Sequence, residues 1–588
     1  MQIAFTPVGG KVDLTIKSKP LPRVNMILQK LSAKISRILI AAGIAFFLPT
    51  LGHSQPAALS SDNKDSIDSS GQACQALADL RNLTITSASI RDNDQGSQPY
   101  CYVRGIISPA IHFHAQLPLP ENWNGRFLQW GDGGKDGDLD FANNRVAEGY
   151  AVTNSNTGHD SGVEPGASFG FNNRQAEIDF GYRAVHLTVM AGKTIVKAYY
   201  GSGPDYSYFE GCSQGGRQGL MEAQRYPDDF DGIVAGAPAF AYQALNAAGT
   251  WNLQRIFRDN LNGNLAVDTT GDGDFDSLRL IDVLHDQVLK KCDARDGILD
   301  GVVNDPFTCP FNPSLDLADL MCPINAAGDQ CFTEAQLQTV QDLYEGPRDD
   351  NGVQIYPGKM FGSEKRWAGL YIPHAGNNNG PGKLMGVAGD HMNYLFYEQD
   401  PGVSVPNVKD THYQAKKGGV VPEFHWFDYD INDFTSGKGD LMMSITDATD
   451  PDLSRFLKDR GGKLIVYHGL VDTLIVASDT VDYYQEMVST SFSGSFADAG
   501  RSSRLFLAPG MAHCSGGAGP NSWDKLAPLV DWVENGRAPD SITATYNRGG
   551  EVVNERPLCA YPAQASYVGP SNGANDPKNW RAENFECR

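Results

Sequence analysis

Short apolar and alternating runs between residues 100 and 238 predict a series of β-strands. Residues 100–107 are rich in aromatic and β-branched side chains, and residues 111–117 alternate apolar with polar positions as a half-buried strand does. Further strands are expected at 126–130, 148–154, 206–209 and 232–238. Residues 176–200 carry apolar side chains at helical spacing, and 216–225 form a second expected helix. This alternation predicts a mostly parallel sheet that helices cover on both faces.

The strand pattern stops after residue 239 and returns near residue 456. The intervening segment is rich in Asp, Asn, Gly and Pro, and the next strands are expected at 462–468 and 504–509. An insertion at the carboxyl edge of a parallel sheet lies over the ligand site. We therefore expect residues 55–239 and 456–588 to form the catalytic domain and residues 240–455 to form a lid. The alternative is a second, functionally independent domain.

The N-terminus has the pattern of a targeting segment. Three basic residues, Lys30, Lys34 and Arg37, precede the short apolar run 38–48, which small residues follow. This order is typical of a secretory signal peptide, and the run is shorter than the ~20 apolar residues that a membrane-spanning helix needs. We expect residues 1–54 to be a signal peptide, with a possible spurious extension before Met26, and the protein to be secreted or periplasmic.

The net charge of the chain disfavours two classes of partner. Two further expectations concern the residues that follow the expected signal peptide. The formal net charge of -22 argues against nucleic acid or an anionic membrane as a partner, because both are polyanions. Apolar residues make up 41% and charged residues 20% of the chain, as in globular proteins. The mature chain is expected to begin near Gln55. Residues 55–72, rich in Ser, Asp and Ala, are expected to lack regular structure.

All ten cysteines follow the expected signal peptide. An even number in an exported chain predicts five disulfides, although spacing alone leaves their connectivity open. The absence of a C-x-x-C pair disfavours a zinc ribbon or a thioredoxin-type site. The cysteines are Cys74, Cys101, Cys212, Cys292, Cys309, Cys322, Cys331, Cys514, Cys559 and Cys587.

The chemistry of the chain is expected to centre on Ser213. Residues 211–215 read Gly-Cys-Ser-Gln-Gly, a G-x-S-x-G pattern between an expected strand and an expected helix. In this context the pattern indicates a nucleophile elbow, a strained turn that needs glycine on both sides of the serine. Ser213 is therefore the candidate nucleophile of an α/β-hydrolase. The alternative is an ordinary glycine-rich turn that matches by chance.

A serine nucleophile needs a histidine base and a carboxylate that orients it, and in α/β-hydrolases they follow the serine in the order acid, then histidine. The loops after the last two expected strands supply Asp472 and His513. Asp472 is preferred to Asp479 and Asp482, because those two fall in the helix that should follow. His468 precedes the acid, so we expect it to pack near the site rather than act as the base.

The oxyanion hole should combine the N–H of Gln214 with an N–H from an earlier glycine-rich loop. That loop follows the strand at 126–130 and contains Gly133 and Gly134, either of which could be the second donor. The alternative is an ordinary tight turn. A phosphate site is disfavoured, because no G-x-x-x-x-G-K-[S/T] pattern is present and the loop is acidic.

Two cysteines flank the candidate catalytic residues. Cys212 directly precedes Ser213, and Cys514 directly follows His513. If they pair, the disulfide would hold the two Cα atoms roughly 5.5 Å apart, a spacing that suits a Ser–His hydrogen bond between their neighbours. Chance placement beside both candidates is improbable, so the cysteines strengthen the assignment of Ser213 and His513.

The combination of Cys212-Ser213, Asp472 and His513-Cys514 resembles the CS-D-HC motif of the tannase and feruloyl esterase family, which includes MHETase-like enzymes. The resemblance extends over nearly the whole mature chain and implies an α/β-hydrolase fold with a large inserted lid. It also implies the pairings Cys74–Cys101, Cys292–Cys309, Cys322–Cys331 and Cys559–Cys587. Supporting matches are 123–126, 180–186 and 211–217.

The segment 292–306 is dense in carboxylates and contains two glycines, a composition that suits a hard cation such as calcium. It is not an EF-hand, because the D-x-D-x-D-G order is absent. The alternative is a solvated acidic turn, which is also the preferred interpretation of the acidic loop 268–276. The family resemblance implies a structural calcium ion bound by Asp293, Asp296 and Asp300 and by the carbonyl groups of Ile298 and Val302. No organic cofactor is implied.

The resemblance implies hydrolysis of a small ester of an aromatic, hydroxycinnamic or hydroxybenzoic acid, including esters attached to plant polysaccharide or polyphenol. Terephthalate monoesters are an alternative, but the sequence does not reveal a cation for their free carboxylate. A non-catalytic, hydrolase-like binding protein is the alternative from another class. Aromatic side chains of the lid are candidates for stacking on the substrate ring or for the lid core. They are Trp367, Tyr371, Tyr394, Phe396, Phe424, Trp426 and Phe427.

Overall fold

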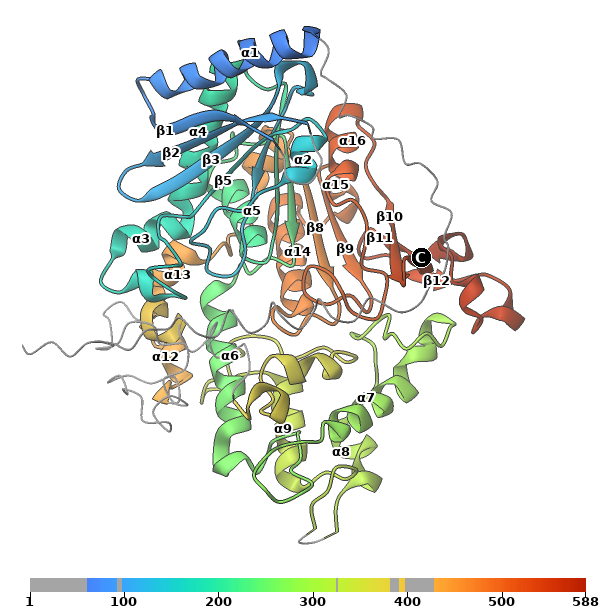
Figure 1. The fold of residues 1–588 in the computed structure, drawn as a ribbon. Coiled ribbons are helices and arrows are strands. Elements are labelled where there is room, and N and C mark those ends of the chain that lie inside the picture. Colours follow the sequence, from blue (N-terminus) through green and yellow to red (C-terminus); the bar gives the residue numbers. More distant parts are fainter. Residues whose placement is uncertain (1–60, 93–97, 324–325, 381–390, 397–427) are drawn as a thin grey trace, which may run out of the picture. The chain divides into compact units, whose positions relative to one another are not determined.

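The computed structural model describes residues 61–92, 98–323, 326–380, 391–396 and 428–588 (Figure 1). The expected signal peptide and the expected mature start at Gln55 lie outside these residues. Residues 61–588 form one compact unit, so the insertion and the sheet are not separate bodies. In the described ranges, no helix has the length and apolarity to cross a membrane.

A nine-stranded sheet organises the fold, in the order β1-β2-β3-β5-β4-β6-β7-β8-β9. Strands from β4 to β9 pair in parallel with their neighbours, whereas β1, β2 and β3 form an antiparallel extension that joins β5. This arrangement confirms the predicted α/β-hydrolase fold. The strands are β1 (Thr84–Arg91), β2 (Tyr100–Ile107), β3 (Ile111–Pro118), β4 (Arg126–Trp130), β5 (Ala151–Ser155), β6 (Tyr206–Cys212), β7 (Gly232–Gly236), β8 (Lys463–Gly469) and β9 (Ser503–Ala508).

Successive residues of the central strands point to opposite faces of the sheet, as the two-residue strand period requires. Phe209 of β6 and Ile233 of β7 pack in one cluster with α4 (Ala184–Tyr200), α5 (Gln214–Arg225) and α14 (Ala477–Phe492). Tyr208 and Val234 pack in another cluster with α2 (Asn143–Ala147) and α16 (Ala527–Asn535). Both faces of the parallel strands are therefore covered, which explains their nearly continuous apolar sequence.

Several helices differ in extent from the predictions. The predicted helix at 176–200 is three consecutive segments, because a π-helical turn, η4 (Asp179–Arg183), separates α3 (Arg174–Ile178) from α4. The prediction that residues 55–72 lack regular structure is wrong from Ser61 onward, where α1 (Ser61–Ala76) begins. The remaining elements of the catalytic part are η1 (Leu77–Asp79), η2 (Pro120–Asn122), η3 (Ser168–Gly170) and α15 (Phe496–Ala499).

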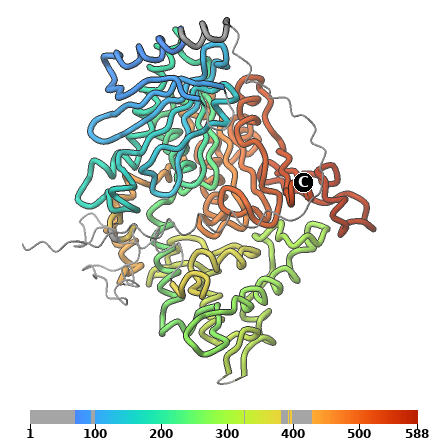
Figure 2. Tube along the Cα trace, viewed as in Figure 1, coloured from blue at the N-terminus to red at the C-terminus, as the bar shows by residue number. Residues whose placement is uncertain are grey.

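The described part of the insertion between β7 and β8 contains helices but no strand of the sheet, and its path can be followed from green to orange in Figure 2. Two hydrophobic clusters lie largely within it, and one of them also includes Ile475 and Val476 from the loop after β8. Its described helices are α6 (Tyr242–Phe257), η5 (Arg258–Leu261), α7 (Arg279–Cys292), η6 (Asp293–Asp296), α8 (Pro313–Asp316), η7 (Ala318–Leu320), α9 (Glu334–Glu345), η8 (Glu364–Gly369), η9 (Ala375–Asn377), η11 (Met392–Phe396), α12 (Asn432–Thr435), α13 (Asp440–Thr446) and η13 (Arg455–Asp459).

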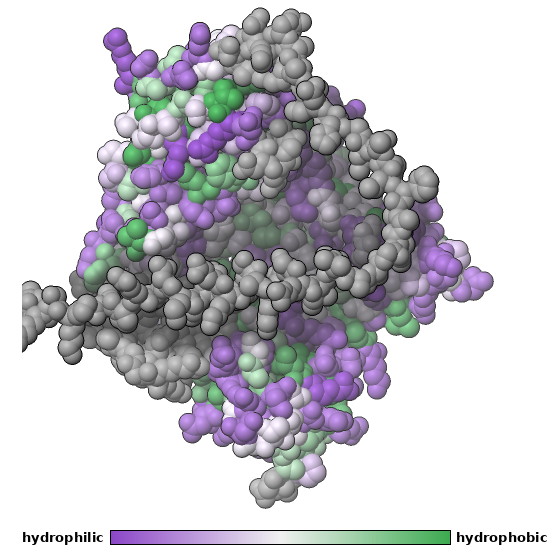
Figure 3. All heavy atoms as spheres, in the orientation of Figure 1, coloured by the Kyte–Doolittle hydropathy of each residue, from purple (hydrophilic) through white to green (hydrophobic). Residues whose placement is uncertain are grey.

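The C-terminal segment adds an antiparallel hairpin of β10 (Ser541–Arg548) and β11 (Glu551–Cys559), and a second pair of β12 (Ala565–Tyr567) and β13 (Phe585–Cys587). Three short helices, η14 (Ser571–Gly573), η15 (Pro577–Asn579) and η16 (Ala582–Asn584), lie between β12 and β13. On the face drawn in Figure 3, hydrophobic side chains form small patches among hydrophilic ones. Scattered apolar residues are normal on a protein surface.

Candidate active site

Ser213 lies in the sharp turn between β6 and α5. Its backbone angles are φ 67° and ψ -121°, an unusual conformation for a residue other than glycine. The two flanking glycines allow the chain to pass close to itself: a Cβ atom on Gly211 would lie 2.7 Å from the backbone of Gly215, and one on Gly215 would lie 2.8 Å from the carbonyl oxygen of Asp132. The turn has the geometry of a nucleophile elbow, with the candidate nucleophile Ser213 at its apex.

Asp472 and His513 meet at the carboxyl edge of the sheet. His513 Nδ1 donates to Asp472 Oδ2 at 2.6 Å, and the two residues come from the loops after β8 and β9. The other carboxylate oxygen accepts from the backbone N–H groups of Leu474 at 2.9 Å and Ile475 at 3.1 Å. These bonds fix the carboxylate and hold the imidazole with its proton on Nδ1.

Asp472 and His513 shift each other's pKa. Burial raises the pKa of the Asp472 carboxyl, but the charge of His513 and hydrogen bonds from His468 and His513 outweigh burial and hold the pKa below its usual value. Burial lowers the pKa of His513, but the charge and hydrogen bond of Asp472 outweigh it, so the pKa of His513 is raised. Asp472 is thus a carboxylate that stabilises a proton on His513.

His468 supports the carboxylate rather than competing as the base. Its Nε2 lies 3.2 Å from Asp472 Oδ2 and 3.0 Å from the carbonyl oxygen of Ile475, and its Nδ1 lies 2.9 Å from Thr480 Oγ1. Because the carbonyl oxygen can only accept, Nε2 carries the proton. The side chain is fully buried, which agrees with its predicted place beside the site.

The disulfide Cys212–Cys514 joins the nucleophile turn to the histidine loop, as its flanking positions predicted. The Cα atoms are 6.0 Å apart, and the bridge spans a sequence separation of 302 residues. Ser213 and His513 are therefore next to bridged residues. In the described part of the chain, Ser213 Oγ makes no protein hydrogen bond, and such bonds are often long before substrate binds.

The expected oxyanion donors lie near the elbow, with one difference between the two glycines. The N–H of Gly133 donates to the side chain of Asp132 at 2.7 Å. Within the described ranges, the N–H groups of Gly134 and Gln214 have no protein acceptor. A Cβ atom on Gly133 or on Gly134 would meet no atom within 4 Å, so the loop is open at both glycines. Because the N–H of Gly133 is already bonded to Asp132, the N–H of Gly134 is the better candidate for the second donor.

The other four disulfides form in the pairs that the family resemblance implied. They leave no free cysteine, which suits an oxidising compartment. The pairs are Cys74–Cys101, Cys292–Cys309, Cys322–Cys331 and Cys559–Cys587.

The acidic segment after α7 has buried carboxylates and one buried cation. Arg556 of β11 contacts Asp296 and Asp300, each at 3.0 Å, and all three side chains are nearly inaccessible. Asp293 is also buried, and its carboxylate accepts from the N–H groups of Asp300 and Gly301. One guanidinium leaves part of the charge of three carboxylates uncompensated. Burial and the neighbouring Asp300 raise the pKa of Asp293, and burial raises the pKa of Asp296 to about 6.

The donor set of this segment fits a hard divalent cation. In the described residues, the carbonyl oxygens of Ile298 and Val302 accept no hydrogen bond from the protein. Carboxylate and carbonyl oxygens with excess negative charge are the ligands that calcium prefers. However, the carboxylates of this segment do not bring three oxygen atoms within 4.8 Å of one another. Among the described residues, only His186, Glu222 and Asp229 bring three such ligand atoms within 4.8 Å of one another.

Four of the seven lid aromatics named above are described, and all four are buried in the lid. Trp367 and Tyr371 belong to one hydrophobic cluster, and Tyr394 and Phe396 belong to the other. These four therefore form lid core. The remaining three, Phe424, Trp426 and Phe427, lie outside the described residues.

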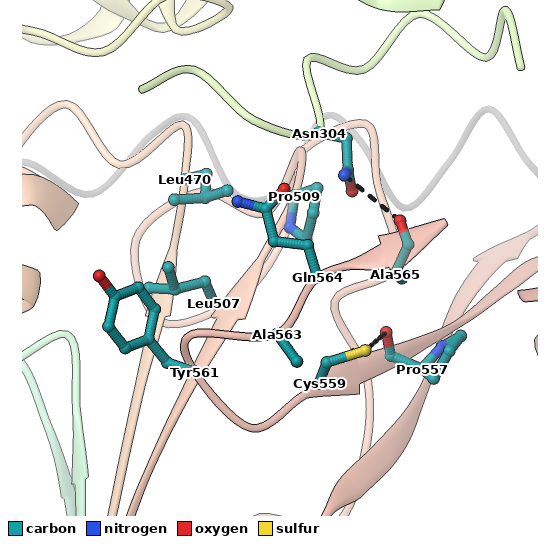
Figure 4. A pocket seen from close by; sticks show the side chains of 10 residues that line it. All are labelled: Asn304, Leu470, Leu507, Pro509, Pro557, Cys559, Tyr561, Ala563, Gln564 and Ala565. Atoms are coloured by element: carbon teal, nitrogen blue, oxygen red, sulfur yellow. Dashed lines mark hydrogen bonds between the residues drawn. The ribbon is translucent and has the colours of Figure 1, made fainter. Parts of the chain in front are cut away.

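Two cavities lie near the carboxyl edge of the sheet. The first, drawn in Figure 4, is lined by side chains such as Leu470, Leu507 and Tyr561 and measures only about 30 Å³. That volume suits a water molecule and not an aromatic ester. The second measures about 340 Å³ and is lined by Asp472 and His513. This second cavity, which we call the histidine cavity, has the size of a small-ligand site.

Comparison with known proteins agrees with this geometry. The sequence model of the family described as "Tannase and feruloyl esterase" matches residues 100–582. The mono(2-hydroxyethyl) terephthalate hydrolase of Piscinibacter sakaiensis is 32% identical, over 84% of this chain and 85% of the relative. Feruloyl esterase B of Aspergillus niger is 31% identical, over 86% of this chain and 90% of the relative. The crystal structure of feruloyl esterase B from Aspergillus oryzae has a TM-score of 0.72 at 25% identity, covering 88% of this chain and 100% of that one.

Proposed function

The chain belongs to the tannase and feruloyl esterase family, and we propose that it hydrolyses esters of hydroxycinnamic or hydroxybenzoic acids through an acyl-enzyme on Ser213. It is a carboxylic ester hydrolase with a small ester as its substrate. The observation that carries the proposed mechanism is the Asp472–His513 hydrogen bond, held next to Ser213 by the Cys212–Cys514 disulfide.

In the proposed mechanism, neutral His513 accepts the proton of Ser213 as the serine oxygen attacks the ester carbonyl. The carbonyl oxygen gains negative charge, which the N–H groups of Gln214 and Gly134 stabilise. His513 then gives its proton to the departing alcohol, which leaves the acyl group on Ser213. A water molecule, deprotonated by His513, attacks this ester and releases the aromatic acid. Asp472 stabilises the imidazolium during both steps.

Feruloyl-type or galloyl-type esters are the proposed substrates, and terephthalate monoesters are the second candidate. Relatives named as a feruloyl esterase and as a mono(2-hydroxyethyl) terephthalate hydrolase match this chain about equally well, so identity does not separate the two candidates. The ester could be part of a plant polysaccharide or polyphenol. The basic and apolar pattern before residue 54 supports secretion or a periplasmic location.

Calcium is the proposed structural metal. Asp293, Asp296 and Asp300 would bind the ion together with the carbonyl groups of Ile298 and Val302. The excess carboxylate charge and the unpartnered carbonyl oxygens support this assignment. A bound divalent cation would compensate buried negative charge where the insertion contacts β11, and no catalytic step depends on it.

The test is release of aromatic acid from methyl ferulate, methyl gallate, a chlorogenate and a monoester of terephthalate, with the Ser213→Ala variant as the control. We expect turnover of at least one ester by the oxidised wild-type protein, and a loss of roughly 10⁴-fold or more in the variant. A folded wild-type protein that hydrolyses none of them would favour the non-catalytic binding protein. Activity that survives in Ser213→Ala would contradict the proposed nucleophile.

A further inference from the structure

One side chain of the helix that follows Ser213 contacts both ends of the glycine-rich loop expected to supply an oxyanion donor. Gln218 lies in α5, and its side chain is almost fully buried. The backbone N–H of Asp132 donates to Gln218 Oε1 at 3.3 Å, and Gln218 Nε2 donates to Asp136 Oδ2 at 2.7 Å. The two candidate glycines lie between these contacts. Gln218 therefore connects the donor loop to the helix of the candidate nucleophile.

Hydrogen bonds within the loop fix the peptide group that carries the Gly134 N–H. The carbonyl oxygen of Gly133 accepts from the N–H of Asp136 at 3.0 Å. Since a peptide group is planar, a fixed Gly133 carbonyl also fixes the direction of the Gly134 N–H. Asp136 has a positive φ of 56°, a conformation that costs energy for a residue with a side chain. The hydrogen bond from Gln218 helps to hold Asp136 in this conformation.

Packing holds the start of the loop but not the part that contains Gly134. A Cβ atom on Gly131 would lie 3.0 Å from the Cα atom of Gly215, so the loop begins in direct contact with the elbow. At Gly134 no described atom is so close, and the carbonyl oxygen accepts a long hydrogen bond, 3.4 Å, from Tyr242. The direction of the Gly134 N–H therefore depends mainly on the hydrogen bonds of the turn and of Gln218.

The two acids that Gln218 holds are buried beside the expected oxyanion. Burial raises the pKa of Asp132 and of Asp136, and the charge of Asp136 raises the pKa of Asp132 further. A neutral carboxyl group still accepts a hydrogen bond from Gln218 Nε2, and it places no full negative charge near the developing oxyanion. A neutral amide at position 136 should therefore be able to replace the carboxyl group.

We propose that Gln218 is a positioning residue that directs the Gly134 N–H toward the oxyanion by holding Asp132 and Asp136. The inference rests on the proposed esterase function and adds to it a residue that acts through the backbone of the loop. The carbonyl oxygen of the ester gains its charge only as Ser213 attacks. A misdirected N–H should therefore slow the chemical step and leave binding of the ester nearly unchanged.

The first experiment replaces Gln218 by an apolar side chain of similar size. For the panel ester that the wild-type protein hydrolyses fastest, Gln218→Leu should lower kcat about 10- to 100-fold and change KM less than about threefold. The matched control is Gln224→Leu in the same helix, whose side chain donates to Ala448 and Tyr483 and not to the glycine-rich loop. It should keep the wild-type kcat. The Tm of each variant checks that it folds.

A second comparison tests the bond to Asp136 with Gln218 unchanged. Asp136→Gly removes the acceptor, and glycine adopts the positive φ without strain. Asp136→Asn keeps an acceptor oxygen, and asparagine also tolerates this conformation. We expect kcat to fall in Asp136→Gly and to stay within about threefold of the wild type in Asp136→Asn. The double variant Gln218→Leu/Asp136→Gly should lose little more than Gln218→Leu alone, because both changes remove the same bond.

Inhibition by a boronic acid distinguishes a misdirected N–H from a general loss of structure. Boron in phenylboronic acid accepts the Ser213 oxygen, the serine proton passes to His513, and the tetrahedral adduct places an oxygen where the oxyanion forms. In Gln218→Leu its inhibition constant should rise by about the same factor as kcat falls. The inhibition constant of planar benzoate should change less than about twofold.

The outcomes separate this inference from the proposed function. If folded Gln218→Leu has the wild-type kcat, or changes only KM, the positioning role is wrong and the esterase function stands. A loss of kcat with unchanged inhibition by phenylboronic acid, or a folded Asp136→Asn protein as slow as Asp136→Gly, would also contradict the positioning role. If the folded wild-type protein hydrolyses no ester of the panel, the proposed function itself fails, and the inference fails with it.

Discussion

Asp472 is the residue on which the polar groups of the site converge. Both of its oxygens accept hydrogen bonds, and the side chain is inaccessible to solvent. A buried carboxylate is costly unless such partners stabilise it, and here the charge of His513 and the hydrogen bonds hold the pKa of Asp472 below its usual value. Its charge in turn raises the pKa of His513. Asp472 therefore offsets the effect of burial on the pKa of the proposed base.

This coupling predicts the pH dependence of the enzyme. In the proposed mechanism neutral His513 is the base, so kcat/KM should rise with pH as His513 loses its proton. The midpoint should lie above the ordinary histidine pKa of 6.5, because Asp472 raises it. In Asp472→Asn the burial of His513 is no longer opposed, so the midpoint should move down and the plateau should fall by about 10⁴-fold. The measurement is the pH profile of kcat/KM for both proteins.

A matched control is Asp479→Asn, in which the changed acid lies in α14 and makes no hydrogen bond to His513. It should keep the wild-type midpoint. An Asp472→Asn protein with the wild-type midpoint would contradict the assigned role of the carboxylate.

At the scale of elements, the elbow and the histidine loop are joined by one covalent link. Ser213 adopts its unusual backbone conformation at the end of β6, and Cys514 beyond β9 also has a positive φ of 58°. Conformations of this kind cost on the order of 1–3 kcal/mol and persist where the surroundings hold them. The Cys212–Cys514 disulfide connects these two strained turns, so we expect it to act mainly on the geometry of the site.

Removal of this disulfide should therefore affect turnover more than folding. We expect Cys212→Ala/Cys514→Ala to lower kcat by at least about tenfold, since a small displacement of a catalytic group has a large effect on rate. Removal of the lid disulfide in Cys322→Ala/Cys331→Ala is the control and should leave kcat within about twofold. The comparison uses kcat and Tm of both variants in matched samples. Equal kcat in the two variants would show that the bridge does not position the triad.

The acidic segment 292–306, the proposed calcium site, connects the insertion to the C-terminal hairpin. Asp296 and Asp300 contact Arg556 of β11, so the charge of this segment acts across the two parts of the chain. Treatment with a calcium chelator should lower Tm by several degrees, because buried carboxylates would lose a compensating cation, and added calcium should restore it. Asp300→Asn should have a lower starting Tm and a smaller response to the chelator. A wild-type Tm that changes with neither chelator nor added calcium would contradict the metal site.

The strands that carry the site could be predicted from sequence because they are buried on both faces. The strands β4 to β9 read as short apolar runs, and the candidate catalytic residues lie in the turns and loops that follow β6, β8 and β9. β1 could not be found in this way. It lies at the edge of the sheet, its pattern is mostly exposed, and its sequence is polar. The hairpin β10–β11 was not predicted either, because the buried positions of β11 include the polar residues Asn554 and Arg556, which interrupt the apolar pattern.

The parts of the candidate site that single sequence motifs specify could be predicted. The serine turn, the carboxylate and the histidine follow strands at recognisable positions, and two cysteines flank the reacting pair. The use of the Gly133 N–H by Asp132 depends on local backbone geometry, which sequence does not reveal. The place of η8 in the lining of the histidine cavity depends on how the insertion folds over the sheet, which no sequence motif specifies.

At the scale of the whole molecule, the fold brings four distant segments to one edge of the sheet. The elbow, the two loops after β8 and β9, and η8 of the insertion are all within residues 61–588, which form one compact unit. Residues of the insertion line the same cavity as His513, an arrangement that suits the expected lid. We expect substrate preference to be determined by this insertion and the chemical step by the sheet.

The central claim is that Ser213 becomes acylated, and the most direct measurement is the mass of the protein after brief reaction with a substrate and acid quenching. We expect a mass increase equal to the aromatic acyl group, located by peptide analysis on the peptide that contains Ser213. The Ser213→Ala protein should show no such increase. An acyl group on another residue, or turnover that continues in the variant, would contradict the account.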